Sequence, residues 1–308
     1  MQDARCKWKP ANRQLVTVNY SLTLNPEPCT LIPPHMPELP EVETIRRNLA
    51  RTIKGRRISH LTVLQPAMVK REVTPAELAK RARGRTVIAV KRRGKALLLI
   101  LDTADVMVFR LGMTGQMLWS SHGRPVRRDR HTHVIIDFGA GERLLFRDPR
   151  RFGEIYLTGT GNIERILRMG AEPLRRKFTP AVLHDVINSR VRIKQLLLDQ
   201  QRIAGIGNIY SDEILFEAGI HPCTPSCSIK GVRLGKLHKA VCLILREAIA
   251  CNGDTFSDYR TAFNENGTYQ DNHRVYQRQG EPCLRCGTPI ERMRLGGRSS
   301  HYCPRCQK

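Results

Sequence analysis

The chain has 308 residues with a 41% hydrophobic share, which can bury a substantial core, and its length predicts two domains. Lys and Arg outnumber Asp and Glu by 52 to 28, giving a formal charge of +24 that points to nucleic acid as the partner. The sequence disfavours a membrane surface, because it has no apolar run of about twenty residues and no basic amphipathic helix with an aromatic face.

Residues 1–35 do not resemble a secretion signal. Their most apolar run, 15–24, is interrupted by Thr, Asn and Ser, and no small-residue cleavage site follows it. The next segment has the features of a chain start, because Pro40 and Glu41 predict the first turn of a helix that Gly55 ends.

The pattern of the chain changes near residues 158–173. Runs rich in β-branched and aromatic residues predict strands at 86–101, 106–113, 133–139, 143–149 and 152–158. Helical spacing follows at 163–170, 180–189, 192–200, 208–219 and 232–253. We therefore expect a first half built mainly of β-sheet and a second half built of helices.

A glycine turn precedes the predicted helix at 208–219. Gly205 and Gly207 would leave the first peptide N–H groups of this helix free to hold a phosphate, with the Asn208 amide beside them. Ordinary helix punctuation is an equally good interpretation of this turn when it is considered alone.

Four of the ten cysteines form a C-x2-C-x16-C-x2-C pattern: Cys283, Cys286, Cys303 and Cys306. This spacing is typical of one structural zinc ion, since four thiolates complete a tetrahedron and leave no position for substrate. The alternative is a pair of disulfides in an extracellular module, which the absence of a recognisable signal peptide disfavours.

Gly296 and Gly297 lie between the cysteine pairs and predict a tight hairpin turn. Arg292, Arg294 and Arg298 would project from this hairpin and contact nucleic acid, or else form a solvated charged surface.

Six motifs occur in the order found in bacterial formamidopyrimidine-DNA glycosylases, and the chain resembles that family over residues 36–308. They are "MPELPEVET" at 36–44, "RRGKALLL" at 92–99, "LGMTGQ" at 111–116, "DPRRFG" at 148–153, "GIGNIYSDE" at 205–213 and "GRSSHYCPRCQK" at 297–308. The resemblance implies an α+β fold with an N-terminal β-sandwich flanked by helices, a helix-two-turn-helix domain and a four-cysteine zinc-finger β-hairpin. It implies a base excision repair enzyme that removes oxidised purines from double-stranded damaged DNA and cleaves the abasic site by β,δ-elimination.

The resemblance also implies the catalytic residues. Pro37 would be the nucleophile through its α-amine, and Glu38 would be the acid that protonates the sugar ring oxygen. Lys95 would contact phosphate beside the lesion, although without the motif the simpler interpretation is a surface lysine on a strand. Arg298, on the zinc hairpin, would bind the DNA phosphates and assist the final elimination.

Further residues match the family's DNA contacts. Met113, Arg150 and Phe152 would fill the gap left by an extruded nucleotide, whereas Met113 or Phe152 alone would more often be core residues. The remaining DNA contacts would be His131, Arg190 and Asn208.

The resemblance also suggests how the chain is organised. We expect an N-terminal catalytic domain at 36–165, a helix-two-turn-helix domain at 166–265 and a zinc finger at 274–308. Residues 1–35 would be an extension that the mature protein lacks. The expected enzyme is a bacterial, cytoplasmic, nucleoid-associated monomer without a membrane partner.

Two other functions remain open. An endonuclease VIII-like enzyme would prefer oxidised pyrimidines, but that branch usually opens with "PEGPE", where this chain has Leu39. The chain would instead be a non-catalytic binder of damaged DNA if the extension stays attached and keeps the nitrogen of Pro37 in a peptide bond.

We predict that translation starts at Met36 and that methionine removal exposes Pro37. Intact mass spectrometry of the protein from its native source should give the mass of residues 37–308. Recovery of a full 308-residue chain that cleaves DNA strands would contradict both this start and the assignment of Pro37 as nucleophile.

Overall fold

The computed structural model describes residues 36–70, 73–255 and 258–308, so the expected extension at 1–35 lies outside the described residues. In the described ranges, no helix is long and apolar enough to cross a membrane.

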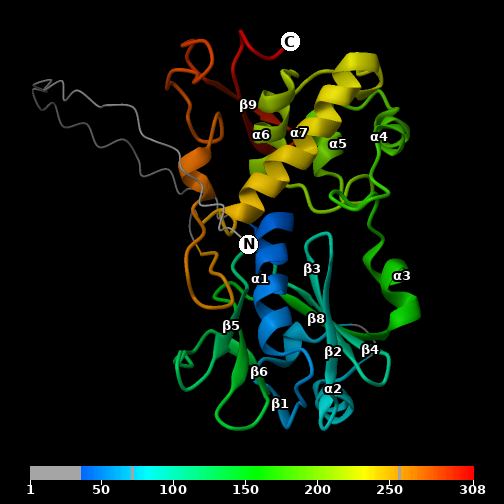
Figure 1. The fold of residues 1–308 in the computed structure, drawn as a ribbon, viewed down its shortest axis with the longest axis vertical. Helices are drawn as coiled ribbons and strands as arrows, with labels where there is room; N and C mark the ends of the chain where they lie inside the picture. Colours follow the sequence, from blue (N-terminus) through cyan, green and yellow to red (C-terminus); the bar gives the residue numbers. More distant parts are fainter. Residues whose placement is uncertain (1–35, 71–72, 256–257) are drawn as a thin grey trace, which may run out of the picture. The chain divides into compact units, whose positions relative to one another are not determined.

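Two four-stranded antiparallel sheets make up the first half of the described chain (Figure 1). The first sheet has the order β1-β6-β7-β5, with strands His60–Val63, Thr132–Asp137, Arg143–Arg147 and Gln116–Ser120. The second has the order β2-β3-β4-β8, with strands Val87–Arg93, Ala96–Leu101, Asp105–Arg110 and Glu154–Gly159. These strands confirm the predicted β-rich first half.

The space between the sheets is filled by one face of each strand. Phe109 of β4 meets Phe146 of β7 edge to face, with ring centroids 5.8 Å apart. Strand β3 is buried on both faces, because Leu97 and Leu99 join the core between the sheets while Leu98 packs with α3 on the other side. This double burial explains the unbroken apolar run of β3.

Helix α1, Leu39–Thr52, joins the β-sandwich to the helical half. Val42, Ile45 and Leu49 enter the core between the sheets, whereas Leu39 belongs to the core of the helical half. The helix starts and stops as the sequence predicts, with Pro40 in its first turn and Gly55 at a φ of 82° just beyond its end. The start of α1 is thereby fixed between both halves.

The second half is helical, as predicted. Besides α2, Pro75–Ala82, which packs on the sandwich, the helices are α3 Ile163–Leu167, α4 Pro180–Ile187, α5 Ile193–Leu198, α6 Asn208–Ala218 and α7 Gly231–Ala250. Short 3-10 turns lie at Pro66–Met68, Thr160–Asn162, Ser226–Ser228 and Tyr269–Asn272. Helix α6 packs against α5 and α7, and its apolar residues form the centre of this core.

The chain ends in the predicted hairpin, with β9 at Glu291–Leu295 and β10 at Arg298–Tyr302. Gly296 and Gly297 form its turn at φ values of 57° and 76°, which side-chain-bearing residues rarely adopt. The fold therefore confirms the expected class: α+β, with a sandwich, a helical domain and a terminal hairpin.

Candidate active site and DNA interface

The carboxylate of Glu38 is held by the start of helix α6. Its Oε1 accepts a hydrogen bond of 3.1 Å from the Ile209 N–H, and its Oε2 accepts one from the Gly207 N–H. The Leu39 N–H donates to the Gly205 carbonyl at 2.9 Å. The prediction that this helix start is free for a phosphate is therefore wrong, because a carboxylate of the chain itself occupies the anion site.

Burial is the largest influence on the pKa values of Glu38 and of its neighbour Lys95. It raises the pKa of Glu38 above its usual value, although Lys95 and the two peptide N–H groups favour the charged form. Burial also lowers the pKa of Lys95, against the attraction of Glu38 and Glu41, and nearby Arg298 lowers it further. The pKa shifts of both side chains thus favour their neutral forms, a perturbation that often marks functional sites.

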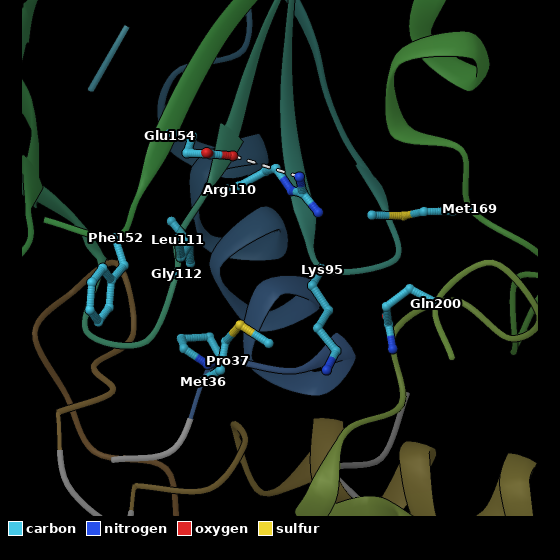
Figure 2. Close-up of a pocket in the computed structure, with 10 residues that line it drawn as sticks. All are labelled: Met36, Pro37, Lys95, Arg110, Leu111, Gly112, Phe152, Glu154, Met169 and Gln200. Atoms are coloured by element: carbon cyan, nitrogen blue, oxygen red, sulfur yellow. Dashed lines mark ion pairs between the residues drawn. The ribbon is translucent and has the colours of Figure 1, made fainter. Parts of the chain in front are cut away.

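Pro37 and Lys95 lie in the wall of one cavity of about 240 Å³ (Figure 2). Lys95 comes from the turn between β2 and β3, so its interpretation as a surface strand lysine is wrong. Arg110 and Glu154 form an ion pair of 3.6 Å in the same wall. No sequence pattern indicates this ion pair, because the two residues meet only through the pairing of β4 with β8.

Glu172 anchors the turn that carries Lys95. The Glu172 carboxylate accepts 2.8 Å hydrogen bonds from the Gly94 N–H and from Arg93, and it also pairs with Arg92. Glu172 is buried, so these charge-assisted bonds are shielded from water. The ion-pair cluster thus fixes the backbone immediately before Lys95.

The expected gap-filling residues lie on two turns that touch. A side chain on Gly112, next to Met113, would come within 2.8 Å of the Phe152 carbonyl oxygen. Thr114 accepts a hydrogen bond from the Arg150 N–H at 3.2 Å, and Arg150 stacks over the Phe152 ring. Phe152 is 52% exposed, which contradicts its interpretation as a core residue. Met113 is half-buried.

The other expected DNA contacts are distributed around this region. The carbonyl of His131 accepts a 2.8 Å bond from Asp148, which joins its loop to the turn of Arg150. The Asn208 amide reaches Ser299 at 3.5 Å, beside Arg298 of the hairpin. Arg190 and Arg298 are exposed, Arg190 on the segment before α5.

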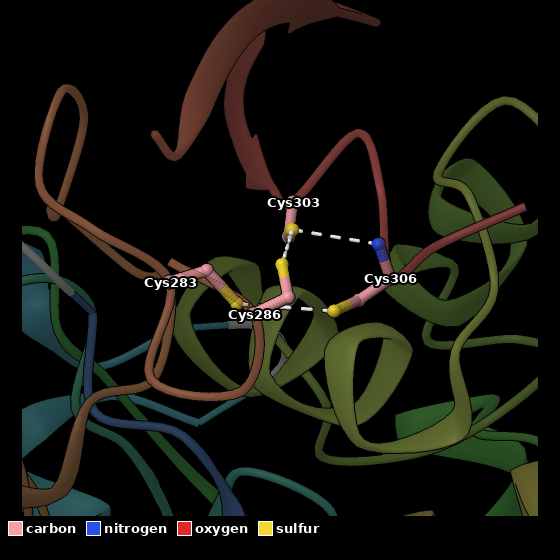
Figure 3. Close-up of side chains that lie close together, drawn as sticks. All are labelled: Cys283, Cys286, Cys303 and Cys306. Carbon is pink, nitrogen blue, oxygen red and sulfur yellow. Dashed lines mark hydrogen bonds between the residues drawn. The ribbon is translucent and has the colours of Figure 1, made fainter. Parts of the chain in front are cut away.

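The four predicted zinc ligands come together at the base of the hairpin (Figure 3). All four sulfur atoms lie within 4.8 Å of one another, with Sγ–Sγ distances of 3.5 Å between Cys286 and Cys303 and 3.9 Å between Cys283 and Cys306. A tetrahedral zinc site with Zn–S bonds of about 2.3 Å needs sulfur atoms about 3.8 Å apart. The donor set therefore fits one structural zinc ion.

A buried ion pair fixes the other end of the hairpin. Lys194 of α5 donates to Asp212 of α6 at 2.6 Å and to the Ser299 carbonyl at 2.7 Å. Asp212 also accepts from the Ser300 hydroxyl and the His301 N–H. No sequence pattern predicts this ion pair, although Asp212 lies inside the "GIGNIYSDE" motif.

A β-sandwich, a buried carboxylate at a helix start, exposed basic side chains and a four-cysteine hairpin are together typical of an enzyme that acts on nucleic acid. Comparison with known proteins gives the same class. The sequence matches the formamidopyrimidine-DNA glycosylase N-terminal domain at 36–155, the H2TH domain of that enzyme at 169–260 and the zinc finger found in FPG and IleRS at 280–308.

Individual relatives extend this match over most of the chain. The formamidopyrimidine-DNA glycosylase of Geobacillus kaustophilus is 41% identical over 277 residues, which are 89% of this chain and all of the relative. Structures of Lactococcus lactis FPG in complex with DNA superpose with TM-scores of 0.81 and 0.80, at 33% and 32% identity, over 88% of this chain and 100% and 99% of theirs. The DNA contains Fapy-dG in one complex and an abasic site in the other. The chain belongs to the formamidopyrimidine-DNA glycosylase family.

Loss of zinc should remove DNA affinity and leave the sandwich folded, because the metal site lies outside the core between the sheets. We predict that Cys303→Ser releases zinc and weakens binding to abasic-site DNA at least about tenfold. Metal analysis, gel shift and thermal unfolding measure the three properties. Cys227→Ser, outside the cluster, should behave like the unchanged protein, and tight DNA binding by zinc-free Cys303→Ser would contradict the prediction.

Proposed function

We propose that this chain excises oxidised purines, such as 8-oxoguanine and formamidopyrimidines, from double-stranded DNA and then cleaves the abasic site by β,δ-elimination. The observation that carries the proposal is the position of Pro37 in a cavity wall beside Lys95, directly before a buried acidic residue. Family membership supplies the reaction type, and the DNA in the Lactococcus lactis complexes indicates the class of substrate.

The α-amine of Pro37 is the proposed nucleophile. A free secondary amine attacks C1′ of the sugar, and the base leaves with the electrons of its C1′–N bond. The C1′–O4′ bond then breaks with a proton going to O4′, so the ring-opened sugar remains attached as an iminium. The positive charge makes the C2′ proton acidic, so the two phosphates leave in successive eliminations. A proline nitrogen inside a peptide bond cannot react, because its lone pair is delocalised into the carbonyl.

Glu38 is the proposed acid for base removal. Its burial favours the protonated form, while the N–H groups of Gly207 and Ile209 stabilise the carboxylate once the proton has been given away. The two hydrogen bonds thus hold the Glu38 carboxyl group in one position in both its protonated and its ionised form. Protonation of the ring oxygen O4′ opens the sugar ring of the intact nucleotide and so promotes departure of the base, whereas a preformed abasic site already exists in part as the open-chain aldehyde.

The basic and apolar side chains around the cavity would hold the DNA. Lys95 and Arg298 would contact the phosphates beside the lesion, which is supported by the electrostatic coupling between them. Met113, Arg150 and Phe152 would occupy the gap left by the extruded nucleotide, supported by their adjacent turns. His131, Arg190 and Asn208 would make further DNA contacts.

The organisation of the chain is also proposed. The catalytic domain would span 36–165, the helix-two-turn-helix domain 166–265 and the zinc finger 274–308. The three domain matches fall within these ranges and support this division. The enzyme would act as a monomer on the chromosome in the bacterial cytoplasm, which is consistent with its bacterial relatives.

Variants of a protein that starts at Pro37 separate the nucleophile from the acid. Pro37→Gly retains a primary amine and should still form some borohydride-trapped adduct with abasic DNA. Glu38→Gln should slow excision of 8-oxoguanine by about a hundredfold or more and slow cleavage of a preformed abasic site far less, since that substrate has already lost its base. Single-turnover assays on both DNAs measure this difference.

The exposed Glu77→Gln on helix α2 is the matched control and should change neither rate. Equal losses on the two DNAs for Glu38→Gln would show that Glu38 supports the site as a whole and is not the acid.

A further inference from the structure

A second buried carboxyl group lies directly behind Glu38. Glu41 accepts 2.8 Å hydrogen bonds from the Glu38 N–H at Oε2 and from the Asp254 N–H at Oε1, together with one from the Tyr210 hydroxyl. Burial, and next the negative charge of Glu38, raise the pKa of Glu41 to about 7. Glu41 therefore changes its charge in the neutral pH range, in direct contact with the backbone of the proposed acid.

A tight turn after helix α7 brings Asp254 to Glu41. Asn252 and Gly253 have φ values of 59° and 86°, and a side chain on Gly253 would come within 2.8 Å of Glu41 Oε1. The turn thus needs glycine at the point of closest approach. The side chain of Asp254 points to His273, whose Nε2 lies 2.5 Å from Asp254 Oδ2.

Asp254 and His273 form an ion pair shielded from water. They are only 4% and 8% exposed, and Asp254 Oδ1 has no hydrogen-bond partner among the described residues. Burial alone would lower the pKa of His273, but the bond and the charge of Asp254 outweigh it and raise that pKa. In its imidazolium form, which this pKa shift favours, His273 balances the charge of the Asp254 carboxylate next to Glu41.

The other ionisable groups around this cluster are few. Those that act on Glu41 come from its own segment, the β2–β3 turn, α6 and the loop after α7: Glu38, Lys95, Tyr210, Asp254 and Tyr259. Those that act on His273 are Asp254, Glu213 and Asp271. The rings of Tyr269 and Tyr276 pack edge-on against the imidazole.

We propose that Asp254 and His273 are positioning residues for base excision, which set the net charge behind Glu41 and, through Glu41, the ionisation of Glu38. This inference rests on the proposed function. Without the imidazolium, the Asp254 carboxylate is uncompensated, and its negative charge favours the protonated forms of Glu41 and Glu38. Removal of both the Asp254 carboxylate and the His273 imidazolium leaves the net charge next to Glu41 unchanged.

The test is the pH dependence of single-turnover 8-oxoguanine excision from about pH 5.5 to about 9, with protein that starts at Pro37. Such a protein keeps all three matched domains except for Met36. His273→Gln should move the alkaline limb of the profile up by about one pH unit. The double variant Asp254→Asn with His273→Gln should bring the limb back to its original position.

A purely structural role would lower the rate at every pH and leave the limb where it is. An unmoved limb in active His273→Gln, or a shift that persists in the double variant, overturns the proposal. If His273→Gln does not fold, NMR titration of His273 in the unchanged protein decides: a pKa above 6.5 supports the pair and a lower one overturns it.

Borohydride trapping of the unchanged protein on abasic DNA separates the two hypotheses. Absence of the trapped adduct would overturn the proposed function itself. Trapping together with an unmoved limb would overturn only the role of Asp254 and His273.

Discussion

The two hydrogen bonds that the start of helix α6 donates to the Glu38 carboxylate are the contact on which the site depends. They join residues 38 and 207–209, from opposite halves of the described chain. An isolated carboxylate would be costly to bury, and the two N–H groups with the positive end of the helix offset part of that cost. Because Glu38 follows Pro37 directly, the same bonds hold Pro37, the proposed nucleophile, in the cavity wall.

The rest of the molecule supports this contact from several sides. Leu39 packs in the helical core while the following turns of α1 pack in the sandwich, so the start of α1 cannot shift without disturbing both. Glu172 holds the turn that brings Lys95 to the same point. The zinc site and the Lys194–Asp212 pair fix the hairpin that carries Arg298. Several separate anchors thus place charged groups around one small volume.

Local features of the fold could be predicted from the sequence because short-range chemistry determines them. Pro40 and Gly55 delimit a helix, Gly296 and Gly297 make a hairpin, and the four cysteines meet at one point. Of the site, the predicted residues Glu38 and Lys95 do come together, and Phe152 is exposed as the motif implied. These residues lie in motifs whose order along the chain is enough to indicate the family resemblance.

Contacts between distant residues could not be predicted. The glycine turn before α6 looked like a free phosphate site, since no local pattern shows that a carboxylate 169 residues earlier fills it. Asp254 and His273 carry no recognisable motif, and only the turn at Gly253 brings Asp254 to Glu41. Glu41 was visible as a first-turn acid, but its burial against Tyr210 depends on the tertiary fold.

The most direct test of this account is Gly207→Ala in protein that starts at Pro37. The added methyl group would lie 2.3 Å from Cδ of Glu38 and 2.6 Å from Nζ of Lys95, so both side chains must move. We predict that 8-oxoguanine excision falls by about a hundredfold while zinc content and thermal stability of the sandwich are retained. Gly235→Ala on α7, with no atom within 4 Å, should keep the original rate. Excision by folded Gly207→Ala at the rate of the unchanged protein would contradict the central role of the Glu38 contact.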